Sequence, residues 1–159
     1  MSNFNPKRET VMNMPRTLSA SAIALFLASG VGTAFAASPA ALARAHIRDV
    51  AQGKVDALVA QYGTEPVLEW VGGPLNGRYR GTHAIRGVWA KFAKANAPLK
   101  AKVTHVQTAA NPAGATVTAD VRFTGKATIP VRYVLTYRSG KLVNEIWQID
   151  PHMARSAGY

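Results

Sequence analysis

The chain has 159 residues, with 19 Lys and Arg against 8 Asp and Glu, and it contains no cysteine. The lack of cysteine excludes a disulfide framework and thiolate metal sites. The length allows one domain with one sizeable core, and the formal net charge of +11 indicates a surface that attracts anions.

The N-terminal region has the three parts of a secretory signal. Basic residues up to Arg16 precede an apolar run at 18–32, and an A-x-A site follows at Ala34-Phe35-Ala36. We therefore predict that residues 1–36 are a cleaved signal peptide and that the mature protein is secreted or periplasmic. The alternative interpretation is an uncleaved membrane anchor, because the apolar run is just long enough to span a bilayer. Met12 and Met14 are alternative start positions.

Two short helices are predicted at the start of the mature chain. Ser38 can cap a helix over 38–52, and Pro39 suits its first position. A second helical pattern runs from Lys54 to Tyr62, and glycines follow both segments. We expect this helical hairpin to pack on one face of a sheet.

The next segment combines strands, a turn and a third helix. A strand is predicted over 65–71, and the glycine-rich turn "GGPLNG" leads to a short strand at 78–80. From Gly81 the apolar residues recur at helical spacing up to Ala93, and the helix ends before Pro98.

The rest of the chain is predicted to be four strands, over 99–109, 115–125, 127–138 and 142–150. Residues 152–159 are predicted to form a flexible C-terminal tail. This order of elements predicts an α+β fold for residues 37–151, in which three helices pack on a curved, mostly antiparallel sheet.

The same order, together with several short motifs, resembles the nuclear transport factor 2-like superfamily in its SnoaL-like and ketosteroid-isomerase-like branch. The motifs are "GKVD" at 53–56, "RYRG" followed by "AIR" at 84–86, and "GKL" with "WQID" near the end. The resemblance covers roughly residues 40–151. It implies a cone-shaped α+β barrel with an internal pocket, commonly dimeric through the outer face of the sheet. Members of the superfamily include isomerases, dehydratases, cyclases, epoxide hydrolases and non-catalytic binders.

The resemblance also indicates which residues stand at the positions that abstract a proton in the isomerase pattern. In the isomerase pattern a carboxylate base ends the first strand, but Trp70 occupies that position here. Glu69 is adjacent and points to the opposite face, because side chains alternate along a strand. The two donor positions of the pattern fall on His46 and Tyr133. Classical steroid isomerisation is therefore not expected.

Glu145 is the main candidate for a functional carboxylate. If Tyr133 faces inward, strand alternation places Val131 and Leu135 beside it. The resemblance likewise turns the last-strand residues Val143, Glu145, Trp147 and Ile149 inward. Our hypothesis is that Glu145, His46 and Tyr133 form the polar cluster of the pocket, with Glu145 as the candidate acid or base. In the alternative, a bulge turns Glu145 outward to pair with an arginine such as Arg132.

The aromatic residues indicate an apolar pocket. We expect ligand contacts from Trp70, Tyr62, Tyr79, Trp147, Val131 and Leu135, although Tyr62 is also explained as a simple core residue. Two functions follow from these expectations. The first is an exported domain that binds a small hydrophobic molecule without catalysis. The second is an isomerase, dehydratase or cyclase that acts on a small carbonyl compound through Glu145.

Partners and cofactors are predicted mainly by elimination. The histidines lack the spacing of a metal site, and no phosphate-binding loop is present, so we expect neither metal nor cofactor. Asp120 and Arg122 alternate onto the outer face, where a homodimer contact would lie. No acidic residue occurs between Trp70 and Ala119, so weak contact with an anionic envelope surface is a third possibility. Nucleic-acid binding is not expected of an exported chain.

Overall fold

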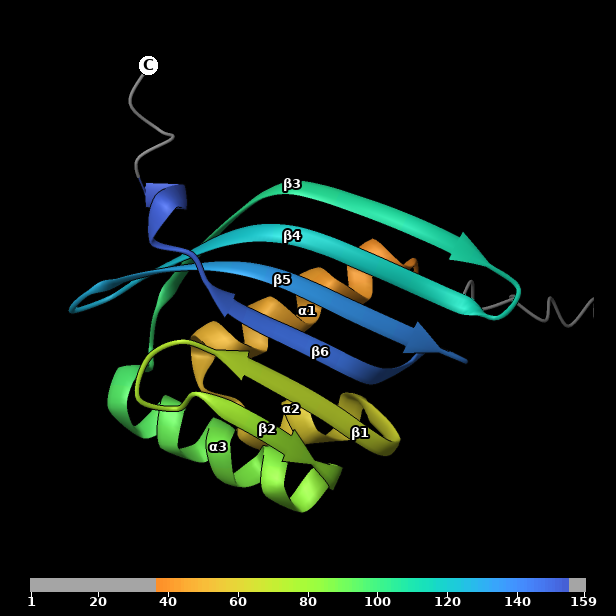
Figure 1. The fold of residues 1–159 in the computed structure, drawn as a ribbon, viewed down its shortest axis with the longest axis horizontal. Coiled ribbons are helices and arrows are strands. Elements are labelled where there is room, and N and C mark those ends of the chain that lie inside the picture. Colours follow the sequence, from red (N-terminus) through yellow and green to blue (C-terminus); the bar gives the residue numbers. More distant parts are fainter. Residues whose placement is uncertain (1–36, 155–159) are drawn as a thin grey trace, which may run out of the picture. The chain divides into compact units, whose positions relative to one another are not determined.

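The computed structural model describes residues 37–154, so the predicted signal peptide and the last residues of the predicted tail lie outside it. Three helices lie against one face of a six-stranded sheet (Figure 1). Within the described residues no helix is long and apolar enough to cross a membrane. The predicted fold class is confirmed.

The first two helices form the expected hairpin, α1 (Pro39–Gln52) and α2 (Val55–Gln61). The Ser38 hydroxyl accepts a hydrogen bond from the Ala41 amide at 3.2 Å, which caps α1. Gly53 ends α1 with a left-handed φ of 69°. A Cβ on Gly53 would lie 2.7 Å from the Cβ of Ala97, so the tight link between the helices requires glycine.

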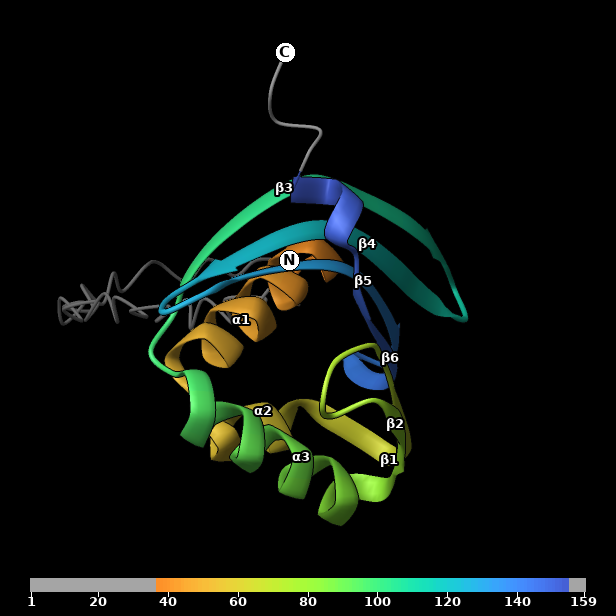
Figure 2. The ribbon, with the colours of Figure 1, turned by 60° about the vertical axis from the view of Figure 1, so that its left-hand side comes forward.

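The third helix, α3 (Gly81–Asn96), buries the stripe that its periodicity predicts: Ile85, Val88, Trp89 and Phe92. It packs against β1 (Tyr62–Val71) and β2 (Gly77–Arg80), while α1 packs under β3 (Lys100–Asn111) and β4 (Gly114–Thr124). Figure 2 shows the sheet curving over the three helices. The space between sheet and helices holds the core.

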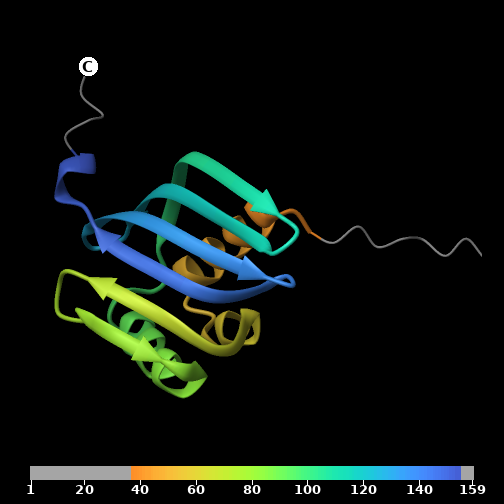
Figure 3. The same cartoon turned by 45° about the vertical axis from the view of Figure 1, so that its right-hand side comes forward.

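The strands lie in the order β2-β1-β6-β5-β4-β3, with β5 at Thr128–Arg138 and β6 at Lys141–Ile149 (Figure 3). Every neighbouring pair is antiparallel except β1 and β6, which run parallel. Because β2 and β3 form free edges, the sheet is an open cone and not a closed barrel. A short 3-10 helix, Pro151–Ala154, follows β6.

Two irregular strand segments differ from the expected pattern. The helical pattern that included Tyr62 ends one residue earlier, and Tyr62 begins β1 ahead of a register shift that ends at Val67. A second shift in β6 makes Leu142 fully buried and leaves Val143 half-buried. The expected inward position of Val143 is therefore wrong, because a bulge moves it off the inner face.

Candidate functional site

The inward-facing residues of β6 lie at successive levels of the interior, from one end of the sheet to the other. Leu142 lies beside Tyr62 and Tyr137, and Glu145 lies beside Leu68 and Leu135. Trp147 follows, paired with Trp70 and Tyr133, and Ile149 lies at the far end beside Val131. The interior is thus a series of levels, with a carboxylate at the second and stacked indoles at the third.

Glu145 is completely buried, and both of its carboxyl oxygens have partners. Oε1 lies 3.0 Å from Nε2 of His46, which comes from α1. Oε2 accepts a short hydrogen bond from the Tyr62 hydroxyl. The structure therefore brings Glu145 and His46 together, as the cluster hypothesis requires. The outward alternative does not occur, because Glu145 is fully buried and Arg132 contacts Asp120 and Asp150 instead.

The histidine is held in one orientation by a second chain of hydrogen bonds. Nδ1 of His46 lies 3.0 Å from the carbonyl oxygen of the Gln61 side chain, so Nδ1 carries a proton and donates it. The amide nitrogen of Gln61 donates in turn to Asp49 at 2.8 Å. With Nδ1 protonated, the contact between Nε2 and Glu145 holds a single proton, as imidazolium with carboxylate or as imidazole with carboxylic acid.

The pKa of His46 shows which form the surroundings favour. Burial lowers the pKa, but the charge of Glu145 and hydrogen bonds to Glu145 and Gln61 outweigh burial, with a smaller contribution from Asp49. The net result is a pKa above the ordinary histidine value of 6.5. The environment therefore favours a buried ion pair.

Tyr62 connects the ion pair to α3. Its hydroxyl donates to Glu145 and accepts a 2.9 Å hydrogen bond from Nε1 of Trp89. Burial and the nearby Glu145 carboxylate raise the pKa of Tyr62 well above its usual 10, so the hydroxyl stays protonated. The residue pattern did not predict this role of Tyr62, although the tyrosine lies at the junction of a helix and a strand.

Two further tyrosines surround the cluster without completing it. Tyr133 is fully buried, and burial together with the charge of Glu145 raises its pKa well above 10. The hydroxyls of Tyr133 and Tyr137 make no hydrogen bond of normal geometry within residues 37–154. Tyr133 thus lies close enough for the charge of Glu145 to raise its pKa, whereas Tyr62 is the tyrosine that donates a hydrogen bond to Glu145.

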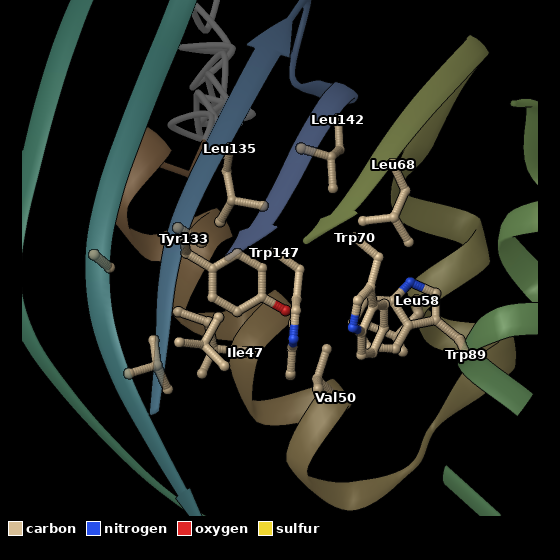
Figure 4. Packing of buried hydrophobic residues seen from close by; sticks show 14 of the residues in the cluster. Ile47, Val50, Leu58, Leu68, Trp70, Trp89, Tyr133, Leu135, Leu142 and Trp147 are labelled. Atoms are coloured by element: carbon tan, nitrogen blue, oxygen red, sulfur yellow. The ribbon is translucent and has the colours of Figure 1, made fainter. Parts of the chain in front are cut away.

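A layer of aromatic rings covers the polar cluster on one side. Trp70 stacks on Trp147 with 4.6 Å between ring centroids, and Trp147 stacks on Phe123 at 5.2 Å. Trp89 meets Trp147 edge-on at 5.4 Å. Figure 4 shows Trp70, Trp147 and Tyr133 side by side between the sheet and α1. This layer separates Glu145 from the end of the domain at which Ile149 lies.

A mostly apolar cavity of about 360 Å³ opens beyond that layer. Its lining comes from β1 and the turn after it, from the last turns of α3, and from β5 and β6: Trp70, Pro74, Leu75, Lys91, Phe92, Ala95, Asn96, Ile129 and Ile149. This volume lies within the range typical of small-molecule sites. We call it the Trp70 cavity.

The expected ligand-binding residues occupy different positions relative to the Trp70 cavity. Trp70 is part of the lining, and Trp147 stacks directly behind it. Tyr79 donates to the carbonyl of Leu75, a lining residue, at 2.7 Å. Val131 and Leu135 are fully buried in the core, and Tyr62 belongs to the polar cluster. Phe92 and Lys91 also line the cavity and were not predicted to do so.

At the opposite end, a smaller cavity of about 270 Å³ lies near the hairpin between β5 and β6. Gln61 and Tyr137 are among its lining residues. Gln61 therefore faces a surface cavity and also binds His46. The polar cluster thus lies between this cavity and the aromatic layer.

The outer face of the sheet carries ion pairs. Glu69 pairs with Arg78 across β1 and β2 at 2.9 Å, which accounts for a carboxylate that points away from the core. Asp120 lies on the same face and contacts His105 and Arg132. A polar cavity of about 310 Å³ lies there, but the sheet separates it from Glu145. Residues 37–154 contain no group of three His, Asp or Glu side chains able to hold a metal ion.

The ion pair between His46 and Glu145 leads to a prediction about stability. Because the pKa of His46 in the folded protein lies above 6.5, its stabilising contribution is fully present below pH 6.5 and is lost as the pH rises through the folded pKa. We expect the free energy of unfolding in urea to fall as the pH is raised above 6.5. Glu145→Gln should flatten this fall and cost about 1–3 kcal/mol at pH 6.

The substituted amide can still donate to Nε2 of a neutral His46 and accept from Tyr62, so this variant is expected to fold. The His46 signals in NMR give an independent measurement in the unmodified protein. A titration midpoint below 6.5 there, or an unchanged pH dependence in Glu145→Gln, would contradict the ion pair.

Comparisons with known proteins agree with this architecture. The profile of the SnoaL-like domain family matches residues 43–145. No curated protein matches the chain significantly. Among solved structures, a nuclear transport factor 2-like protein of unknown function from Pseudomonas putida superposes with a TM-score of 0.58 and 16% identity, over 67% of this chain and 80% of that one.

Two further structures show the same fold. A putative polyketide cyclase from Sinorhizobium meliloti has a TM-score of 0.51 and 18% identity, covering 67% of this chain and 93% of its own. The epoxide hydrolase/cyclase-like enzyme SalBIII of salinomycin pyran-ring formation has a TM-score of 0.54 and 18% identity, covering 70% and 89%. The family profile spans well over half of the chain, and these structures share the fold. The chain therefore belongs to the SnoaL-like domain family.

Proposed function

We propose that this protein binds a small hydrophobic molecule in the Trp70 cavity and does not catalyse a reaction on it. The observation that carries the proposal is the cavity itself: about 360 Å³, with an aromatic floor of Trp70 and Phe92 and aliphatic walls such as Leu75 and Ile149. Concave, mainly apolar sites with a few polar groups are typical of small-molecule binding.

The position of the polar cluster argues against chemistry in this cavity. Trp70 lines the floor where the isomerase pattern has its base, and an indole cannot accept a proton at ordinary pH. Glu145 lies behind Trp147, and His46 and Tyr62 already occupy its two oxygens. A ligand in the cavity would contact aromatic rings, and these rings would separate it from the Glu145 carboxylate.

One observation favours a second function, acid–base catalysis by Glu145 on a small carbonyl compound. A buried carboxylate next to a histidine and a tyrosine is a usual composition for a catalytic site. Catalysis would require Trp147 or Trp70 to move so that substrate could reach the carboxylate. The two functions make different predictions for the same bound ligand.

We also propose that the domain acts outside the cytoplasm after removal of residues 1–36. The predicted A-x-A site supports this proposal, and so does the start of the fold, because Ser38 caps α1 two residues after Ala36. Cleavage there leaves the cap intact. N-terminal sequencing of the full chain expressed in a Gram-negative host should give a periplasmic protein that starts at Ala37. Recovery of the intact chain in the membrane fraction would support the anchor instead.

The cavity proposal predicts the effect of filling the site. Ala95 lies on α3, is exposed and lines the cavity, so Ala95→Phe should occupy the cavity without disturbing the core. We expect this change to weaken binding of the neutral probe 2-naphthamide about tenfold or more in isothermal titration calorimetry. Ala90→Phe is the matched control, because Ala90 is exposed on α3 outside the lining. No binding, or equal losses in both variants, would refute the proposal.

Catalysis by Glu145 can be tested with 2-acetylnaphthalene, a ketone of similar size and shape. A base within reach of its methyl group would speed exchange of the methyl protons for deuterium in D₂O, a reaction that NMR follows directly. For a binding protein we expect no acceleration by the unmodified chain beyond that of the Ala95→Phe variant. Acceleration that disappears in Glu145→Gln would establish the second function instead of the first.

A further inference from the structure

We infer that the molecule bound in the Trp70 cavity is an amphipathic carboxylate whose charged group lies at Lys91. This inference rests on the proposed function and adds the chemical class of the ligand. The cavity offers apolar surface at its floor and one charged side chain in its lining, so it matches a molecule with an apolar body and one charged end.

Lys91 is available for such a contact. Its side chain is exposed on α3 and lines the cavity, and it forms no ion pair with any acidic group in residues 37–154. The acidic residues on the neighbouring strands are already paired, Glu69 with Arg78 and Asp150 with Arg132. A positive charge without a partner therefore remains at the opening of an apolar site.

Asn96 adds a neutral donor next to this charge. Its amide nitrogen donates to the carbonyl of Phe92 at 2.9 Å, which fixes the side chain and leaves the second N–H of the amide for a ligand. Lys91 and Asn96 both line the cavity, so one carboxylate group can be contacted by both. A neutral apolar ligand would use neither the charge nor this donor.

The C-terminus of α3 disfavours a nearby anion, but only weakly. A helix C-terminus carries about half a negative charge from its free carbonyls. Here Asn96 occupies the carbonyl of Phe92, and the amide of Ala97 donates to the carbonyl of Ala93 at 2.9 Å. The full charge of Lys91 on a flexible chain therefore outweighs the helix dipole at the opening of the cavity.

A matched pair of probes tests the inference. 2-Naphthoate and 2-naphthamide share size and shape and differ in charge. We expect the unmodified protein to bind 2-naphthoate about fivefold more tightly in low salt, and this preference should shrink in high salt. Lys91→Gln should remove the preference by weakening only 2-naphthoate. Lys94→Gln, an exposed change on α3 outside the lining, should keep it.

The possible outcomes separate this inference from the proposed function. Equal affinity for the two probes, or a preference that persists in Lys91→Gln, would refute the carboxylate while leaving the cavity as a ligand site. Loss of the preference in Lys94→Gln as well would show a general effect of surface charge and would also refute it. Absence of binding by either probe would refute both proposals.

Discussion

The buried contact between Glu145 and His46 is the interaction on which the rest of the interior depends. Moving a carboxylate and an imidazolium out of water costs several kcal/mol for each ion, and only good geometry with further hydrogen bonds offsets this cost. The structure supplies both. Gln61 fixes His46 from one side, and Tyr62 occupies the second oxygen of Glu145 from the other. Since these residues come from α1, from the end of α2, from the start of β1 and from β6, the pair fixes how the helical hairpin lies on the sheet.

The polar cluster also divides the interior into two ends with different chemistry. On the β5–β6 hairpin side, Gln61 connects the cluster to a small surface cavity. On the other side, Trp147 and Trp70 stack between the cluster and the larger apolar cavity. Because the rings fill the space next to the ion pair, they keep water from it and also form the floor on which a ligand would rest. The same aromatic layer therefore contributes to stability and would also contact the proposed ligand.

The sequence predicts this arrangement wherever the period of two in the strands is undisturbed. Alternation correctly places Glu145 and Trp147 inside, and it places Trp70 inside with Glu69 on the outer face. It fails where a strand is irregular: the bulge at Val143 and the register shift after Tyr62 depend on pairing between distant strands, which one sequence does not show. The role of Tyr62 was missed for that reason. The roles of Gln61 and Lys91 were missed because a polar residue at the end of a helix or on its outer surface carries no periodic signal.

The relation between β1 and β6 explains why this site differs from that of an isomerase. The strands run parallel, with Trp70 beside Trp147 and Leu68 beside Glu145. The carboxylate of this chain therefore lies on the neighbouring strand and one level deeper than the base position that Trp70 occupies. At that depth, His46 and Tyr62 neutralise and bind it, and two stacked indoles cover it. The negative charge then lies inside the core and away from the cavity, whose lining includes Lys91. An interior built in this way fits the proposed binding of an acidic amphiphile better than removal of its protons.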